Sequence, residues 1–138
     1  MIKKVRAIII KDNKILLMRR LKDGREFYVF PGGRAKTKES FEAAVKRVIK
    51  EEFNIEIKIE TFLFREENKG KTEFYFLVRD FEGELKISGE ERQIINDNNQ
   101  FCLEWKSLKN LEELPNLLPQ RAANRITKEL KKAAALVL

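Results

Sequence analysis

The sequence predicts a single α/β domain in which helices pack against a mixed or mostly antiparallel sheet. Runs of β-branched and aromatic residues, which favour strands, recur on both sides of a stretch near residue 45 that has the period of an amphipathic helix. A second helix is expected near the C-terminus, after a proline. The length of 138 residues suits one domain with its own hydrophobic core.

The first part of the chain is predicted to form three strands. Two β-branched runs, at residues 5–10 and 14–18, are separated by Asp12-Asn13, which is good hairpin-turn chemistry. A short aromatic strand follows at 27–30. It ends at Pro31-Gly32-Gly33, where a loop is expected to begin because Pro and Gly interrupt regular structure.

The helical stretch begins at Ser40, whose side chain suits the N-cap position. The apolar residues that follow fall on one stripe of a helix, at the offsets i, i+3, i+4, i+7 and i+8. They are Phe41, Ala44, Val45, Val48 and Ile49. Asn54 is expected to end the helix, because asparagine is the commonest residue after glycine in a left-handed C-terminal cap.

After this helix the chain is predicted to return to strands and to finish in a second helix. The strand candidates lie at 55–64, 72–78, 81–87 and 100–105, with a turn at 68–70 and a long polar loop at 88–99. Pro119 is expected to start the last helix, which runs to about Lys132. The domain is therefore assigned to residues 1–132, and residues 133–138 are set aside as a low-information tail that could derive from an expression vector.

The composition excludes several kinds of catalytic site. The chain has one cysteine and no histidine. An intrachain disulfide, a Cys/His zinc site and catalysis by Ser-His-Asp or Cys-His groups are therefore excluded. Any chemistry must come from carboxylates, Lys, Arg, Tyr, hydroxyls, backbone groups or a metal held by oxygen ligands. Oxygen ligands select hard ions such as Mg²⁺ or Mn²⁺.

The charge balance favours a polyanionic partner without identifying one. The formal net charge is +7, which suits phosphates, nucleotides or nucleic acid, although a lysine-rich solvated surface explains it equally simply. No apolar run approaches the roughly 20 residues needed to cross a bilayer, so no membrane span is expected. No apolar signal core follows the N-terminus, and a cytoplasmic protein is the simplest expectation.

The most specific pattern lies between Gly33 and Ile55. Without a Cβ, Gly32 and Gly33 allow the backbone to turn sharply and to approach a ligand closely. Glu51 and Glu52 fall in the last turn of the predicted helix, where carboxylates are unfavourable unless a cation compensates them. Taken alone, the glycines suit an ordinary turn and the glutamates suit a solvated surface.

This pattern resembles the Nudix box. The box consists of Gly, five residues, Glu, seven residues, Arg-Glu, an aliphatic residue, any residue, Glu-Glu, any residue, Gly and an aliphatic residue. The matching positions are Gly33, Glu39, Arg47, Ile49, Glu51, Glu52 and Ile55. The aromatic strand that ends in Pro-Gly-Gly before the box, and the late strand that contains Trp105, agree with the layout of the family.

The resemblance implies a Nudix-like α/β/α sandwich with a mixed sheet, a central loop-helix-loop and a C-terminal helix. It implies a hydrolase that uses Mg²⁺ or Mn²⁺ to cleave the diphosphate linkage of a nucleoside diphosphate linked to another group. Glu51, Glu52 and Gly33 would bind the metal. Arg47 would orient a glutamate, with Glu39 as its ion-pair partner and structural support.

The resemblance also implies residues that bind substrate and one carboxylate outside the box. Gly32, Gly33 and Arg19 are the expected substrate-binding residues. Arg6, Arg20 and Arg65 are further candidates for contacts to phosphate, although exposed arginines at strand ends are usually solvated. Among the acidic residues of the polar loop, which are Glu90, Glu91 and Asp97, the catalytic role is assigned to Glu91.

Two positions depart from the family pattern. Asn54 replaces a glycine, which is mild because asparagine tolerates the left-handed conformation. Val48 replaces a glutamate of the Arg-Glu pair, and valine can neither bind a metal nor act as a base. A second hypothesis is therefore a catalytically impaired Nudix domain that binds a nucleotide as a sensor or regulator.

A third hypothesis is a small nucleic-acid-binding domain, suggested by the net charge and by the aromatic run at 74–76. It is disfavoured because aromatic residues at period two more often build the core of a sheet. The expected partner is a small nucleotide-type molecule. Which nucleotide it is, and whether the chain is a monomer or a homodimer, stay open.

Overall fold

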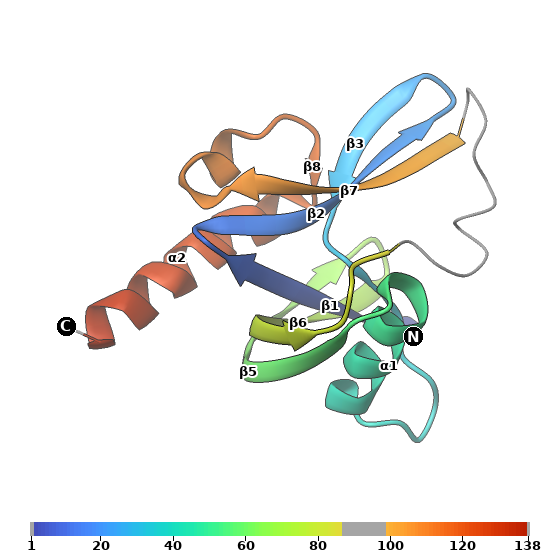
Figure 1. Ribbon diagram of the computed structural model, residues 1–138. Coiled ribbons are helices and arrows are strands. Elements are labelled where there is room, and N and C mark those ends of the chain that lie inside the picture. The colour runs from blue at the N-terminus through green and yellow to red at the C-terminus, as the bar shows by residue number, and fades with distance from the viewer. Residues whose placement is uncertain (1, 87–98, 138) are drawn as a thin grey trace.

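The computed structural model describes residues 2–86 and 99–137 (Figure 1). The strands are β1 (Ile2–Lys11), β2 (Lys14–Lys22), β3 (Arg25–Val29), β4 (Gly32–Arg34), β5 (Glu56–Asn68), β6 (Lys71–Glu82), β7 (Asn99–Ser107) and β8 (Leu117–Leu118). The helices are α1 (Phe41–Phe53), the 3₁₀ helix η2 (Leu108–Glu113) and α2 (Gln120–Val137). The predicted Glu90, Glu91 and Asp97 lie outside the described residues.

The strands form a mixed sheet, as predicted. Its order is β5-β6-β1-β2-β3-β8, with β4 paired to β1 and β7 paired to β2. The β1–β6 and β3–β8 pairs are parallel, whereas the other pairs are antiparallel. β1 and β2 pair only beside their hairpin turn, at Ile10 with Ile15 and Lys11 with Lys14. Two groups of strands therefore diverge from this hairpin (Figure 1).

The two main helices cover opposite faces of the sheet, which gives the α/β/α sandwich. Successive side chains of a strand point to opposite faces, and β1 divides its buried residues accordingly. Val5 and Ile9 belong to the apolar cluster that contains α1, whereas Ile8 belongs to the cluster that contains Ala122 and Ile126 of α2. The same alternation decides which face each polar side chain of β1 and β2 occupies.

Four expectations about the elements need correction. No separate strand forms over the described part of 81–87, because residues 81–82 are the end of β6 and Gly83 takes a φ of +107°. β4 forms where a loop was expected, and β8 was not expected at all. The last helix was expected to end at about Lys132, but α2 continues to Val137.

Both predicted caps of α1 are present. The Ser40 side chain accepts a hydrogen bond from the backbone N of Ala43 at 3.1 Å. Asn54 is left-handed, with φ 61° and ψ 28°. Its Nδ2 also donates to the carbonyl oxygen of Glu84 at 3.2 Å, and Lys86 N donates to the Phe53 carbonyl oxygen at 3.0 Å. Asparagine therefore adds a side-chain bond between the end of α1 and residues 84–86 that glycine would lack.

The aromatic run at 74–76 serves the core. Tyr75 is fully buried and Phe76 is 1% exposed, while the Phe74 ring stacks on Phe41 with the ring centroids 3.9 Å apart. These rings are therefore unsuited to stacking on bases, which removes the structural argument for the nucleic-acid hypothesis. Within the described ranges, neither helix is long and apolar enough to cross a membrane.

Candidate active site

Arg47 connects the loop after β4 to the end of α1. Its Nε donates to Oε2 of Glu39 at 2.7 Å and its Nη2 donates to Oε1 at 2.9 Å. Nη2 also donates to the carbonyl oxygen of Arg34 at 3.1 Å, and Nη1 donates to Oε2 of Glu51 at 3.3 Å. The planar guanidinium suits such bidentate pairing. The ion pair expected between Arg47 and Glu39 is present, and Arg47 also holds one of the predicted metal-binding carboxylates.

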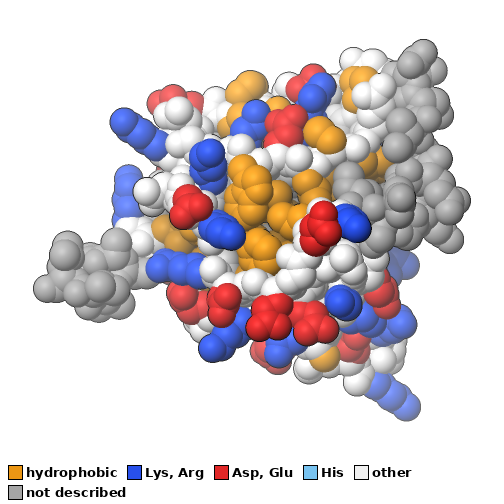
Figure 2. Space-filling model, viewed as in Figure 1, with side chains coloured by type: hydrophobic (Ala, Val, Ile, Leu, Met, Phe, Trp, Pro, Cys, Tyr) orange, Lys and Arg blue, Asp and Glu red, His pale blue; other side chains and the backbone are white. Residues whose placement is uncertain are grey.

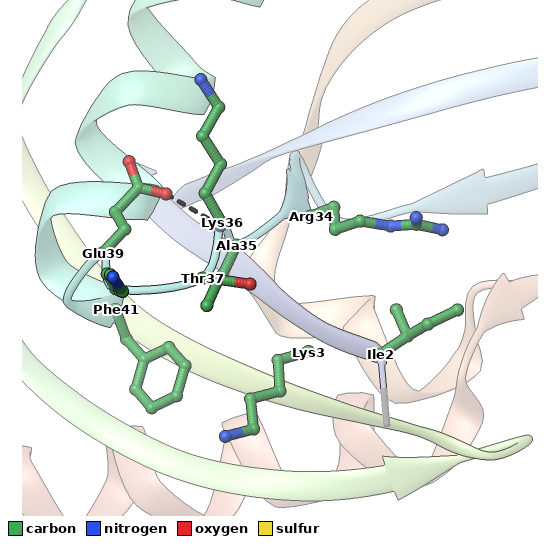
Figure 3. Close-up of a pocket in the computed structure, with 9 residues that line it drawn as sticks. Ile2, Lys3, Arg34, Ala35, Lys36, Thr37, Glu39 and Phe41 are labelled. Atoms are coloured by element: carbon green, nitrogen blue, oxygen red, sulfur yellow. Dashed lines mark hydrogen bonds between the residues drawn. The ribbon is translucent and has the colours of Figure 1, made fainter.

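Both carboxylate oxygens of Glu39 accept hydrogen bonds in this arrangement. Its Oε1 also accepts a hydrogen bond from the backbone N of Lys36 at 3.0 Å, which Figure 3 marks as a dashed line. The hydrogen bonds from Arg47, followed by that from Lys36, lower the pKa of Glu39 from 4.5 to about 2. The same pairing with Glu39 raises the pKa of Arg47. Glu39 is therefore ionised under ordinary conditions and acts as structural support for the loop.

Glu51 and Glu52 lie in the last turn of α1, as predicted. The Glu51 side chain is 60% exposed, and Glu52 is half-buried. Mg²⁺ is commonly held by one or two carboxylates, with waters and substrate phosphates completing the octahedron. The two carboxylates fit a site of this kind. In residues 2–86 and 99–137 there is no group of three or more acidic or cysteine side chains placed to hold a metal without such help.

The two glycines allow β4 to lie tightly between β1 and α1. A Cβ on Gly32 would overlap the carbonyl oxygen of Val5 and approach Cδ of Arg6 to 2.9 Å. A Cβ on Gly33 would lie 2.9 Å from Cγ1 of Val48. Such contacts are closer than a side chain tolerates. The space beside both Cα atoms is thus filled by the protein itself, and the glycines are required by packing whether or not a ligand is bound.

The strand register distinguishes the two glycine carbonyls. Ala7 N donates to the Pro31 carbonyl oxygen at 2.8 Å, and Ala35 N donates to that of Lys3 at 2.9 Å. Hydrogen-bonded pairs alternate along an antiparallel ladder. The intervening pair of Val5 with Gly33 is therefore hydrogen-bonded, whereas the pair of Arg6 with Gly32 is not. The Gly33 carbonyl faces β1, while the Gly32 carbonyl points away from it.

Val48 has become part of the core. It is 4% exposed, belongs to the same apolar cluster as Val45 and Ile49, and contacts Gly33. The helix keeps its packing at this position, but the site lacks the carboxylate of the family pattern. Packing at this position does not compensate for the lost ligand or base.

Adjacent arginines of β2 point to opposite faces of the sheet. Arg19 shares the parity of Leu17, on the α2 side, and pairs with Glu104 at 3.2 Å and Glu26 at 3.3 Å. Arg20 shares the parity of Met18, on the α1 side. Arg19 is the residue predicted to bind substrate, yet Arg20 lies on the sheet face against which the helix of the Nudix-like pattern, α1, packs.

The surroundings of Arg20 are aromatic. Its guanidinium carbon lies 4.2 Å from the ring centroid of Phe101 and 5.7 Å from that of Phe27. Its Nε is buried and has no hydrogen-bond partner among the described residues. A buried, unsatisfied donor is unfavourable unless a ligand or water meets it. The sequence alone does not show which face of β2 is turned toward α1. That information is needed to choose Arg20 instead of Arg19.

A basic pocket of about 420 Å³ lies beside the loop after β4 (Figure 3). Lys3, Arg34, Lys36 and Lys38 line it, together with Phe41. The Lys3 ammonium lies 5.7 Å from the centroid of the Phe41 ring. The pocket does not include Glu51 or Glu52, so it is separate from the predicted metal ligands.

The loop-helix arrangement and the spacing of its charged residues agree with the sequence profile described as the NUDIX domain, which matches residues 1–129. The chain belongs to the Nudix family. No curated protein matches it in sequence. Solved structures of this family resemble it over most of its length.

The ORF135 protein of E. coli is 28% identical, with a TM-score of 0.73, and the match covers 97% of this chain and 92% of that one. The MutT Nudix hydrolase of Burkholderia pseudomallei is 26% identical, with a TM-score of 0.66 and coverage of 88% and 93%. An ADP-ribose pyrophosphatase of Streptococcus suis is 20% identical, with a TM-score of 0.67 and coverage of 96% and 91%. At the last identity, the likeness shows the fold alone.

The Arg47–Glu39 pair should make the stability of this Nudix domain depend on pH. Because folding lowers the pKa of Glu39 from 4.5 to about 2, its contribution is fully present above the unfolded value. It is lost as the pH falls through that interval. The difference in free energy of unfolding between wild type and E39Q should therefore shrink from about pH 6 to about pH 2 in urea titrations. In R47M the pKa of Glu39 is no longer lowered by the guanidinium, so this contribution to the pH dependence of stability should be lost. A difference between wild type and E39Q that stays constant with pH would contradict the account.

Proposed function

We propose that this Nudix domain is a metal-dependent hydrolase of the diphosphate linkage in a nucleoside diphosphate joined to another group. The observation that carries the proposal is the set of hydrogen bonds made by Arg47 to Glu39, Arg34 and Glu51. They link the end of β4 and the loop that follows it to a carboxylate of the proposed metal pair. Pre-organised carboxylates are what a hydrolytic metal site requires.

Similar structures lend support to the substrate class. They include an ADP-ribose pyrophosphatase, an ADP compounds hydrolase and a UDP-X diphosphatase. All three names refer to compounds of a nucleoside diphosphate, which is ADP or UDP. The three structures are 20–22% identical to this chain, so they support the substrate class and not one particular nucleotide.

Glu51 and Glu52 are the proposed ligands of Mg²⁺ or Mn²⁺, with a glycine carbonyl as a further oxygen donor. The bound metal would polarise phosphorus and lower the pKa of a water molecule. Arg47 keeps the Glu51 carboxylate in place through Nη1. The resemblance to the Nudix box implied Gly33 as a metal ligand, but the ladder favours the Gly32 carbonyl, because the Gly33 carbonyl is directed to β1.

The absence of a carboxylate at position 48 favours slow turnover. Loss of a general base commonly lowers a rate by about 10²–10⁴-fold. Glu91, which lies outside the described residues, remains our proposal for a carboxylate that takes this role.

The nucleoside part of the substrate is proposed to lie on the α1-side face of β2 and β7. Partly buried apolar residues pack there, including Phe101, Leu103 and Trp105. Figure 2 shows hydrophobic side chains at the surface between the two groups of strands. Arg20 supplies an unsatisfied donor on this face, and its guanidinium carbon lies 4.2 Å from the centroid of the Phe101 ring.

Metal-dependent cleavage is the first expected outcome. A panel of nucleoside triphosphates, nucleotide sugars, ADP-ribose and dinucleoside polyphosphates, incubated with Mg²⁺ or Mn²⁺, should release phosphate products that chelator abolishes. The double variant E51Q/E52Q should lose this activity because both proposed ligands lose their charge. E42Q is the matched control, since Glu42 lies in the first turn of the same helix. Equal activity of E51Q/E52Q and wild type would refute the assignment of the ligands.

The two arginines of β2 provide an internal comparison. R20A should raise KM by about 10-fold or more, because a buried hydrogen bond to a ligand is worth about 1–3 kcal/mol, while kcat changes less. R19A should leave KM near the wild-type value, since Arg19 pairs with Glu26 and Glu104 on the opposite face. Steady-state kinetics measures both, and a larger effect of R19A would reverse the assignment.

The second candidate function is nucleotide binding without appreciable turnover, favoured by the burial of Val48 in the core. V48E should raise kcat strongly if the missing carboxylate limits the natural domain. V48Q has nearly the same shape without the charge and should give no such gain. Unchanged kcat in V48E would indicate that another residue already has this role. No cleavage by wild type across the panel, with nucleotide binding retained in calorimetry, would favour the second candidate.

A further inference from the structure

A buried charged network lies on the sheet face opposite to α1. Nε and Nη2 of Arg6 donate to Oε1 of Glu73 at 3.2 and 2.9 Å. The side chains are 15% and 2% exposed, respectively. The hydroxyl of Tyr75, which is fully buried, donates to Oε2 of Glu73 at 3.0 Å. Burial, and then the charge of Glu73, raises the pKa of Tyr75, which keeps its hydroxyl a donor.

Arg6 is the member of this network that reaches the segment before the Nudix helix. Its Nη1 donates to the carbonyl oxygen of Phe30 at 3.0 Å. Its Cδ lies 2.9 Å from the position that a Cβ of Gly32 would take, so its aliphatic stem occupies the space beside that glycine. The Phe30 ring also meets the Tyr75 ring edge-on, with centroids 5.7 Å apart. The Arg6 side chain therefore contacts the backbone on both sides of Pro31, through its guanidinium at Phe30 and its aliphatic stem at Gly32.

The same backbone is held from the other face by α1. Gly33 lies against Val48, and the loop that follows is bound to Arg47 through Glu39 and Arg34. The place of the Gly32 carbonyl therefore depends on packing from both faces of β4. Since Arg6 and Gly32 form a pair without ladder hydrogen bonds, the Arg6 side chain provides a restraint that the ladder omits at this point.

Stability alone does not account for such a network. Two charges lose most of their hydration here, and replacing a buried ion pair by apolar residues is often neutral or stabilising. In contrast, groups that orient the ligands of a metal without binding the metal themselves commonly change the affinity of the site for the metal by about 10–100-fold. A role in geometry explains why a guanidinium, with its fixed fork of donors, connects Glu73 to Phe30.

We propose that Arg6 is a positioning residue for the metal site. It holds the Gly32 carbonyl in place relative to Glu51 and Glu52, from the face opposite to α1 and without contact to substrate. This inference rests on the proposed function, because it concerns the metal site of the same domain.

R6K and Y75F separate positioning from stability. Lysine keeps a positive charge beside Glu73, but its compact ammonium lacks the planar fork that serves Glu73 and the Phe30 carbonyl together. Y75F removes a donor to Glu73 from the same network and leaves the bond from Arg6 to Phe30 intact. The double variant R6M/E73M removes both charges at once, so no unpaired charge is buried, and it also removes the donor to Phe30.

Binding of Mn²⁺ alone to the full chain, measured by electron paramagnetic resonance, is the main readout. We expect R6K and R6M/E73M to raise the Kd for Mn²⁺ by about 10-fold or more, while Y75F stays near wild type despite a lower Tm. The Mn²⁺ concentration for half-maximal hydrolysis should shift in parallel. Tm measurements on all four proteins establish that the comparison is made on folded chains.

Unchanged Mn²⁺ binding in R6K and R6M/E73M, with hydrolysis by wild type intact, would overturn this inference and leave the proposed function standing. Equal weakening in R6K and Y75F would also overturn it, because general loosening would then explain the effect. If wild type binds Mn²⁺ but cleaves nothing, the hydrolase proposal fails and the Mn²⁺ comparison still decides the role of Arg6. A wild-type chain that does not bind Mn²⁺ overturns both.

Discussion

The close contact between β4 and α1 is the constraint on which the rest of the site depends. Gly33 and Val48 approach so nearly that any larger residue in place of the glycine would separate the strand from the helix. This contact sets the depth of α1 against the sheet, and therefore the distance from its last turn to the loop. Only at that depth can Arg47 reach Glu39 and the Arg34 carbonyl at once.

Charge is arranged differently on the two faces of the sheet. On the α1 side, Glu39 and Glu51 share one guanidinium, and Glu51 stays exposed to solvent, which suits a carboxylate that must receive a cation. On the α2 side, Glu73 is buried and both of its carboxylate oxygens accept hydrogen bonds, which suits a structural role. With Val48, the α1 side lacks a carboxylate of the family pattern, while the Glu73 network on the α2 side is intact. The fold and the chemistry are therefore under separate physical requirements.

Local chemistry predicted much of the site. The resemblance to the Nudix box implied the Arg47–Glu39 contact, and Ser40 and Asn54 behaved as caps because their side chains suit those positions. The faces of β2 could not be predicted, since 15–18 are buried on both sides and alternation carries no information there. β4 was missed because its three residues have little strand preference and pair only where β1 supplies a partner.

The position of Trp105 has a spectroscopic consequence. It is the only tryptophan of the chain, and it lines a pocket of about 380 Å³ together with Phe81 and Leu85, on the same face as α1. An indole that is partly buried at such a surface changes its emission when the polarity around it changes. The intrinsic fluorescence of this Nudix domain therefore originates from one side of its sheet, and it serves as a label that is already built into the molecule.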